Sequence, residues 1–177
     1  AAMDQGMATD FTRERILNAD ATTVSVGHYE GGVYNNYWVL IFSYPENSHT
    51  EDYRQEVLDL VNAQRAKYGL TALEMGDDDL TAAAQTRAEE IAVVNSHVRP
   101  DGSKCFTVLK DYGVTDTPTG ENAAWGSVSP EEVVTAWMNS EGHRANILDP
   151  EARAMGVGYY YNSSSTWGHQ WIQIFTK

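Results

Sequence analysis

The chain has few of the features that stabilise a protein covalently or draw it to nucleic acid or membranes. Its one cysteine, Cys105, excludes an intrachain disulfide and a zinc cluster built on cysteines. With 12 Lys and Arg against 25 Asp and Glu, the net charge is −13, which argues against nucleic acid or an anionic membrane surface as a partner. No apolar run of about 18 residues is present, so we expect no membrane-spanning segment. The sequence starts without a basic and apolar signal segment, and we expect any export signal to have been removed already.

Helical periodicity dominates the middle of the 177 residues, of which 42% are apolar. Residues 48–51 have the pattern of a capping box, and the helix that follows is predicted to end at Gly69. A second helix follows the acidic run 77–79 and ends near His97, and a third begins at Ser129. The apolar stripes predicted for the first two helices are Val57, Leu60, Val61, Gln64 and Tyr68, then Leu80, Ala83, Ala84, Ala88 and Ile91.

The end of the chain is predicted to be a β-hairpin. Residues 155–161 and 168–176 alternate in polarity and are rich in aromatics, and the polar segment 162–165 lies between them. The Gly- and Pro-containing connector 98–120 is predicted to hold one helical turn around 106–112.

The first 47 residues resemble this C-terminal hairpin. Residues 16–29 align with 147–160, with six identities in fourteen pairs, and after a shift of two residues 38–42 align with 171–175. We interpret residues 1–47 as a degenerate repeat of the hairpin, the remnant of a preceding copy, and 48–177 as the main domain. Thr12 stands in the copy where His143 stands in the main domain, so the copy forms no second site.

The N-terminal copy carries many tyrosine and aliphatic side chains. A two-stranded hairpin alone is marginally stable in water. We therefore expect residues 22–43 to form a hairpin that covers apolar surface, either of the same chain or by self-association with a second chain.

Three ionisable residues from separate segments are the strongest candidates for chemistry. His97 ends the second helix, Glu121 follows Gly120 before an apolar run, and His143 follows the third helix. Two imidazoles and a carboxylate suit a zinc site or a general base if folding brings them together. The structural alternative is a histidine that only caps a helix end. Cys105 is expected to be a buried apolar residue, since the sequence shows no basic partner for a thiolate.

Taken in order, the motifs of residues 50–177 resemble the CAP superfamily, which comprises the cysteine-rich secretory, antigen 5 and pathogenesis-related 1 proteins. The similarity is to the disulfide-free bacterial form called the SCP domain. It implies an extracellular α+β protein, an α-β-α sandwich with a small antiparallel sheet, to which the N-terminal β-hairpin is added. The motifs are Gly-Glu-Asn-Ala-Ala-Trp at 120–125, Ala-Trp-Met-Asn-Ser at 136–140, Gly-His-Arg-Ala-Asn-Ile-Leu at 142–148 and Met-Gly-Val-Gly at 155–158.

In that family two histidines and two acidic residues line a cleft. The resemblance assigns His97, Glu121 and His143 to three of these positions, while the fourth holds Ser140, with Glu141 one residue further on. It implies a cleft for a small-molecule, lipid or extended ligand. It also implies that Zn²⁺ or another divalent cation can bind to His97 and His143.

Two other functions are compatible with the same residues. One is a metal-assisted, peptidase-like hydrolase in which Glu121 is the catalytic base, and Ser140 at the fourth position argues against a mechanism that needs paired carboxylates. The other is a structural or adhesion module with a vestigial cleft.

Overall fold

The computed structural model describes residues 16, 23–43 and 50–177. The chain divides into two compact units, Ala1–Ser48 and His49–Lys177, called here the N-terminal unit and the C-terminal unit. Thr12 and the side chains of the predicted capping pair, Ser48 and Glu51, lie outside the described residues. No helix in the described ranges is both long and apolar enough to cross a membrane.

Helix α3 (Thr50–Lys67) ends where the sequence predicts, because Gly69 takes a left-handed φ of 70° that favours glycine. The prediction for its buried face was wrong at Tyr68, which is 59% exposed, and it missed Leu58 and Arg65, which are buried. Leu60 and Gln64 of the predicted stripe are half-buried. The guanidinium of Arg65 tolerates burial because it donates to three backbone carbonyls. These carbonyls belong to Thr71, Ile147 and Asp149.

The second and third helices begin at their predicted caps, but the predicted end of the second helix near His97 was wrong: the helix ends at Val93, four residues earlier, because the backbone is already extended at Val94. Asp77 caps α4 (Asp78–Val93) by accepting from the backbone N–H of Leu80 at 2.9 Å, and the predicted apolar stripe of α4 is buried. Ser129 caps α6 (Pro130–Asn139). The predicted turn in the connector is α5 (Thr107–Asp111), and α7 (Glu141–Ile147) follows α6 directly.

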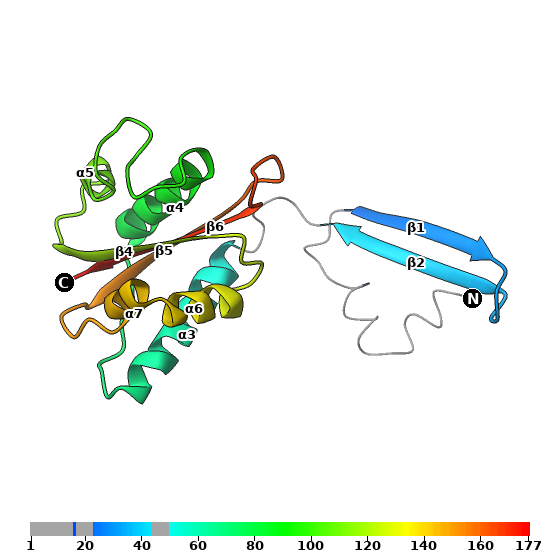
Figure 1. The fold of residues 1–177 in the computed structure, drawn as a ribbon, viewed down its shortest axis with the longest axis horizontal. Coiled ribbons are helices and arrows are strands. Elements are labelled where there is room, and N and C mark those ends of the chain that lie inside the picture. Colours follow the sequence, from blue (N-terminus) through cyan, green and yellow to red (C-terminus); the bar gives the residue numbers. More distant parts are fainter. Residues whose placement is uncertain (1–15, 17–22, 44–49) are drawn as a thin grey trace. The chain divides into compact units, whose positions relative to one another are not determined.

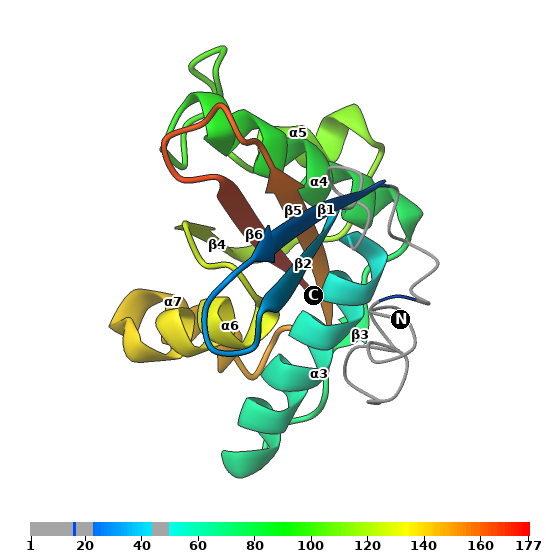
Figure 2. The same ribbon diagram turned by 90° about the vertical axis from the view of Figure 1, so that its right-hand side faces the viewer.

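The C-terminal unit contains a four-stranded sheet in the order β3-β5-β6-β4. Strands β4 (Pro118–Trp125), β5 (Ala154–Tyr161) and β6 (His169–Thr176) pair antiparallel, and the short β3 (Glu74–Met75) runs parallel to β5. Helices α4 and α5 cover one face of the sheet, and α3, α6 and α7 cover the other (Figures 1 and 2). The predicted α-β-α sandwich is confirmed, with β3 as a parallel addition to its antiparallel sheet.

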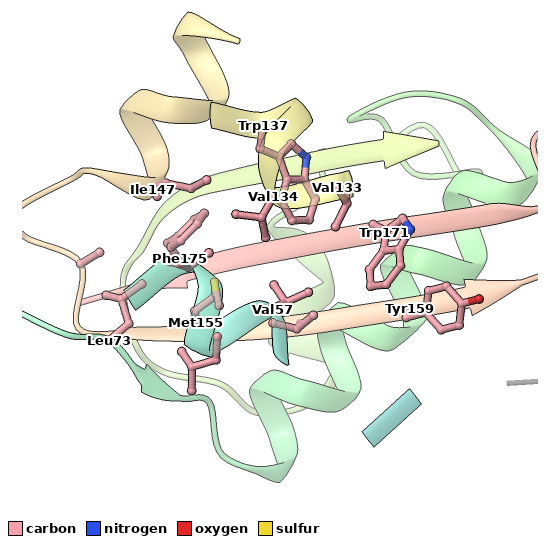
Figure 3. Close-up of a cluster of buried hydrophobic side chains, with 14 residues drawn as sticks. Val57, Leu73, Val133, Val134, Trp137, Ile147, Met155, Tyr159, Trp171 and Phe175 are labelled. Carbon is pink, nitrogen blue, oxygen red and sulfur yellow. The ribbon is translucent and has the colours of Figure 1, made fainter. Parts of the chain in front are cut away.

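Each face of the sheet has its own hydrophobic core. Under α3, α6 and α7 the core includes Trp137 and Trp171, which are 1% and 0% exposed (Figure 3). Trp137 therefore lies on the buried face of α6, as its helical position predicts. Under α4 and α5 the core is built from smaller side chains, including Ala84 of α4 and Ile172 of β6.

Glycine in β5 lets α4 approach the sheet closely. A Cβ atom at Gly158 would lie 2.0 Å from the carbonyl oxygen of Ala84, and one at Gly156 would lie 2.7 Å from that of Leu80. Any side chain at Gly158 would therefore force α4 away from β5, because the obstacle is backbone.

The N-terminal unit contains an antiparallel hairpin, β1 (Thr23–Glu30) and β2 (Asn36–Ser43). The turn between the strands includes Gly32 and Asn35 with positive φ angles of 67° and 64°. The predicted hairpin is thus formed over residues 23–43, and Thr22 lies outside the described residues. Described by itself, it leaves large apolar side chains exposed, with Val26 at 59% and Trp38 at 50%.

Candidate functional site

Glu121 of β4 is a buried carboxylate, with 6% of the residue exposed. It accepts hydrogen bonds from Arg87 of α4 and from His97, which lies in the loop after α4. Nε of Arg87 is 2.9 Å from Oε2, and its Nη2 is 3.2 Å from Oε1, so the guanidinium holds both carboxylate oxygens. Since Arg87 is itself fully buried, the two charges compensate each other in the interior.

His97 is fixed through one ring nitrogen. Its Nδ1 lies 2.7 Å from Oε1 of Glu121. Because an ionised carboxylate can only accept, Nδ1 carries the proton, and Nε2 is the ring nitrogen left for a ligand. The side chain of His97 is 55% exposed, so a ligand can reach it from solvent.

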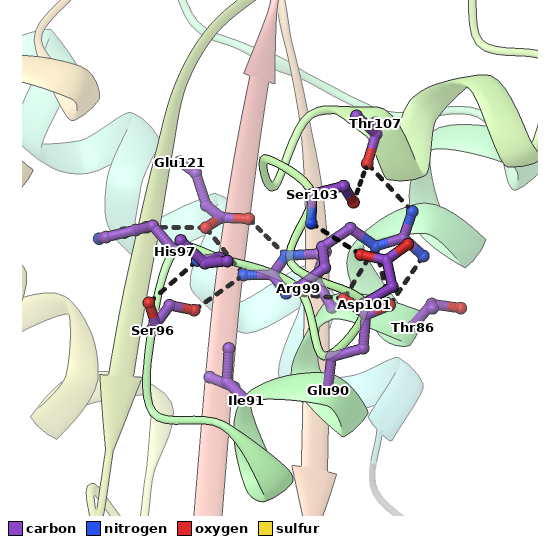
Figure 4. A network of polar contacts seen from close by, with 12 residues as sticks. Thr86, Glu90, Ile91, Ser96, His97, Arg99, Asp101, Ser103, Thr107 and Glu121 are labelled. Carbon is purple, nitrogen blue, oxygen red and sulfur yellow. Dashed lines mark hydrogen bonds and ion pairs between the residues drawn. The ribbon is translucent and has the colours of Figure 1, made fainter.

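A second carboxylate fastens the loop that carries His97 to α4 (Figure 4). Glu90 accepts from Nη1 of Arg87 at 2.7 Å and from Nη2 of Arg99 at 2.7 Å. Arg87 also donates to the carbonyl of Ser96 at 3.1 Å. The backbone is thus held at the residue before His97 and again two residues after it, which limits the positions that the imidazole can take.

Side-chain amides connect α7, which carries His143, to β4. Asn122 donates through Nδ2 to the carbonyl of His143 at 3.1 Å and to Oε1 of Gln173 at 3.0 Å. Asn146 of α7 donates to Oδ1 of Asn122 at 2.9 Å and to the carbonyl of Glu121 at 3.3 Å. His143 therefore cannot shift without disturbing the strand that carries Glu121.

The surroundings move the pKa values of the two histidines in opposite directions. The hydrogen bond that His97 donates to Glu121 raises the pKa of His97, against burial and the charge of Arg87. Burial, followed by the charge of His97, lowers the pKa of His143. Near the usual histidine value of about 6.5, His97 is the more protonated of the two.

Glu121 stays ionised in spite of its burial. Burial alone would raise the pKa of its carboxyl, but the hydrogen bonds from His97 and Arg87 and their charges outweigh burial and lower this pKa. A carboxylate that is bound on both oxygens and has a lowered pKa is suited to orienting His97. The geometry thus favours positioning over the predicted role of catalytic base.

Cys105 adjoins the site as an inert thiol. Its backbone N–H donates to the carbonyl of His97 at 3.1 Å. Burial and the charge of Glu121 raise the pKa of the thiol to about 11, so little thiolate forms at neutral pH. This agrees with its expected role as a buried apolar residue.

The two candidates for the fourth position lie where α6 meets α7. Ser140 ends α6 and precedes α7, and Glu141 is the exposed first residue of α7. The hydrogen-bonded set formed by Arg87, Glu90, His97 and Glu121 includes neither of them.

The residues present do not fit a resident zinc ion. Within residues 16, 23–43 and 50–177, no group of three or more His, Cys, Asp or Glu is arranged to hold a metal. His97 and His143 supply two imidazoles, and the carboxylate of Glu121 is already bound by Arg87. Catalytic zinc sites use three protein ligands and structural sites use four.

The sequence prediction named His97, Glu121 and His143 but missed Arg87. One signal was available, because Arg87 interrupts the alanine-rich stripe that begins at Ala83 in the second helix. A charged side chain on a buried helix face needs an opposite charge nearby. That requirement would have pointed to a buried acidic partner such as Glu121.

Comparison with known proteins finds relatives of the part of the chain that contains His97, Glu121 and His143. The model of the CAP family, described as the cysteine-rich secretory protein family, matches residues 58–175. The chain belongs to the CAP family. YkwD of Bacillus subtilis strain 168, an uncharacterized protein, is 41% identical over 127 residues, which are 71% of this chain and 49% of YkwD. The chain thus spans about half the length of YkwD, and 30% of the Bacillus subtilis membrane protein YlbC, which is 34% identical over 106 residues.

Solved structures of two bacterial proteins share the fold of most of this chain. An extracellular SCP-domain protein from Bacillus anthracis strain Ames aligns with a TM-score of 0.66 at 25% identity, covering 79% of this chain and 47% of that one. An outer surface protein of Borrelia burgdorferi aligns with a TM-score of 0.63 at 21% identity, covering 72% of this chain and 93% of that one. Both are described as proteins outside the cell or on its surface.

Proposed function

We propose that the C-terminal unit is an extracellular ligand-binding module whose ligand contacts His97 and His143. One observation carries the proposal: Glu121, held by the buried Arg87, binds Nδ1 of His97, whose side chain remains 55% exposed. A side chain that is oriented before the ligand arrives loses little freedom on binding, which favours affinity. The location is supported by the descriptions of the two solved structures of similar fold, one an extracellular SCP-domain protein and the other an outer surface protein.

The ligand group that suits this site is an anionic acceptor of hydrogen bonds, such as a carboxylate or a phosphate. A protonated His97 donates through Nε2–H and adds a positive charge. Its raised pKa keeps this form populated to a higher pH than in an ordinary histidine. Binding should therefore weaken as the pH rises through the pKa of His97. The anion can belong to a small molecule, a lipid or an extended polymer.

Nuclear magnetic resonance of the histidine rings tests the site, with acetate and inorganic phosphate as minimal probes. At about pH 6, below the usual histidine pKa, we expect both anions to shift the signals of His97 and His143. His97→Gln should abolish the shift at His143, and His28→Gln in the N-terminal unit is the matched control that should keep it. Equal shifts in wild type and His97→Gln would overturn the proposal.

Zinc binding by His97 and His143 stays a prediction, with an affinity that two imidazoles would limit to micromolar or weaker. Protons compete with the metal for the same nitrogens, so uptake should be lost below about pH 6. Calorimetry on wild type and on the double variant His97→Ala/His143→Ala decides this. Equal zinc uptake by both proteins would rule out these ligands.

A hydrolase is the second candidate function, supported by the opposite pKa shifts of the two histidines. Two neighbouring groups whose pKa values are pushed apart can act as an acid and a base. His97 would donate the proton, His143 would accept one, and Glu121 would position His97. Turnover of ester and peptide libraries tests this function: activity should vanish in His143→Ala, and a wild-type protein that cleaves none of them would favour simple binding.

A further inference from the structure

A pocket of about 440 Å³ lies between α5 and the chain segment that leads into β4. Its volume falls within the range of sites for small molecules, which is about 300–1,000 Å³. Its lining, within the described residues, includes none of His97, Glu121 and His143. A ligand in this pocket is therefore independent of the ligand proposed for the two histidines.

Both walls of the pocket are held by bonds within the protein. Helix α5 is fastened by Arg99, which donates to Asp111 at 2.7 Å. The opposite wall, residues 114–118, begins where the N–H of Val114 donates to the carbonyl of Leu109 at 2.9 Å, and near its end two backbone hydrogen bonds join it to the residue after β6. Because both walls are fixed before a ligand arrives, binding requires little ordering of the protein.

Part of the lining is apolar. Leu109 is 3% exposed, and Phe106, Val114 and Pro118 are half-buried beside the same pocket. Such a surface favours an apolar group over water, and each methylene that it covers raises the affinity about fourfold. The pocket therefore suits a ligand with an apolar body.

The charged part of the lining consists of Lys104, Lys110 and Asp116. Among the residues that the structure describes, neither lysine has a hydrogen-bond or ion-pair partner. The other Lys and Arg side chains of residues 50–177 each donate to an acceptor of the protein. The pocket thus combines two unpaired positive charges with one negative charge, in a chain whose net charge is −13.

We propose that this pocket binds a small carboxylate with an apolar body. The apolar body lies against Leu109 and its neighbours, and Lys104 and Lys110 donate to the carboxylate. A neutral molecule leaves both lysines without a partner, and a cation is repelled by their excess charge. Asp116 opposes an anion, so the lining matches one negative charge better than the roughly two charges of a phosphate monoester.

Nuclear magnetic resonance of the methyl groups tests the pocket, with acetate, butyrate and hexanoate as probes at about pH 7. Hexanoate should shift the signals of Leu109 and Val114. The affinity should rise about fourfold for each methylene along the series. Hexanol, which has the same apolar body without the charge, should bind more weakly than hexanoate.

Charge variants test the part assigned to the lysines. Because exposed charges interact weakly, neutralising Lys104 or Lys110 to Gln should lower the affinity for hexanoate by up to about fivefold each. Asp116→Asn should raise the affinity, since it removes a repulsion. Lys67→Gln is the matched control: it removes the same charge from the end of α3, outside the lining, and should bind like wild type.

Three outcomes overturn the proposal. They are an absence of hexanoate shifts at Leu109 and Val114, equal affinities for hexanol and hexanoate, and an unchanged affinity in the double variant Lys104→Gln/Lys110→Gln. His97→Gln separates this pocket from the candidate site, because hexanoate should still shift Leu109 and Val114 in that variant. Acetate shifts at His97 without hexanoate shifts at Leu109 would remove the pocket and leave the proposed function intact.

Discussion

Trp38 and Trp171 occupy equivalent positions in hairpins β1–β2 and β5–β6, yet Trp38 is 50% exposed and Trp171 is fully buried. Both hairpins have eight paired residues per strand and the same register. The register therefore depends on features that each hairpin contains, namely side-chain alternation and the turn. Burial depends on elements from elsewhere in the chain, which in β5–β6 are α3, α4 and α6. Four pairs of experiments test this difference.

The largest difference is expected at the equivalent glycines of β5 and β1. Gly158→Val would place side-chain atoms inside the backbone of α4, where even a Cβ atom would lie 2.0 Å from the oxygen of Ala84. We expect a loss of more than about 5 kcal/mol in the free energy of unfolding. A Cβ at Gly27 comes no closer than 3.9 Å, to Cβ of Val39, so Gly27→Val should be neutral or stabilising. Urea denaturation measures the free energy of unfolding of both variants. Equal losses would contradict the difference in packing between the two hairpins.

The second-largest difference in stability is expected between the buried and the exposed tryptophans. Trp171→Ala removes a fully buried ring and its hydrogen bond to the carbonyl of Ser127 at 2.8 Å, and should cost about 3–5 kcal/mol. Trp137→Ala, in the same core, should cost a similar amount. For Trp38→Ala we expect a loss of less than about 1 kcal/mol, because this side chain is half exposed. A denaturation midpoint that did not change in Trp137→Ala would contradict the packing assigned to α6.

A smaller difference is expected where a polar and an apolar residue are exchanged. Gln173→Leu takes one acceptor from Asn122 and should cost about 1 kcal/mol, with a change in the resonance of His143, whose carbonyl binds the same amide. Leu40→Gln, the reverse change in β1–β2, should leave the free energy of unfolding within about 0.5 kcal/mol of the wild-type value. An unperturbed His143 signal in Gln173→Leu would show that the amide network does not position it.

The smallest effect concerns pH in the C-terminal unit. Because Glu121 raises the pKa of His97, the protonated imidazole stabilises the fold below the usual histidine pKa, and this contribution is lost as the pH rises through the raised value. The loss should be below about 1 kcal/mol, since the side chain is half exposed. His97→Gln should abolish this dependence, and the control His28→Gln, in hairpin β1–β2, should retain it.

At acid pH, the change of stability with pH depends on Glu121, and here stability falls as the pH falls. Its pKa is lowered, so its contribution is present above the usual glutamate range and disappears as the pH falls through the lowered value. Wild type and His28→Gln should therefore both lose stability in acid. Denaturation midpoints measured across the pH range check the contributions of His97 and Glu121. Midpoints that did not fall in acid would contradict the ionised state assigned to Glu121.

The local elements could be predicted because their signals lie within a few residues. Ser129 caps α6, Gly69 ends α3, and alternation marks β5 and β6. Tyr68 and Arg65 show the limit of this reasoning. Both lie near the end of α3. The carbonyls that bind Arg65 belong to residues up to 84 positions away in the sequence. Helical periodicity contains no information about these partners, so it predicted burial of Tyr68 instead of Arg65.

Part of the candidate site could also be predicted from the sequence. The ordered motifs identify His97, Glu121 and His143 through resemblance. The part that gives them their properties is the ion network of Arg87, Glu90 and Arg99, and it is visible only after α4, β4 and the loop between them are packed.

By itself, the sequence determined where the helices begin, the alternation of the strands and the repeat that relates the two hairpins, since each of these depends on neighbouring residues and on turn geometry. Tertiary structure decided which tryptophan is buried, which arginine neutralises Glu121 and how far the pKa values of His97 and His143 separate. These properties depend on desolvation and on the positions of charges from distant segments, and both are set only when α4 and α7 pack against the sheet.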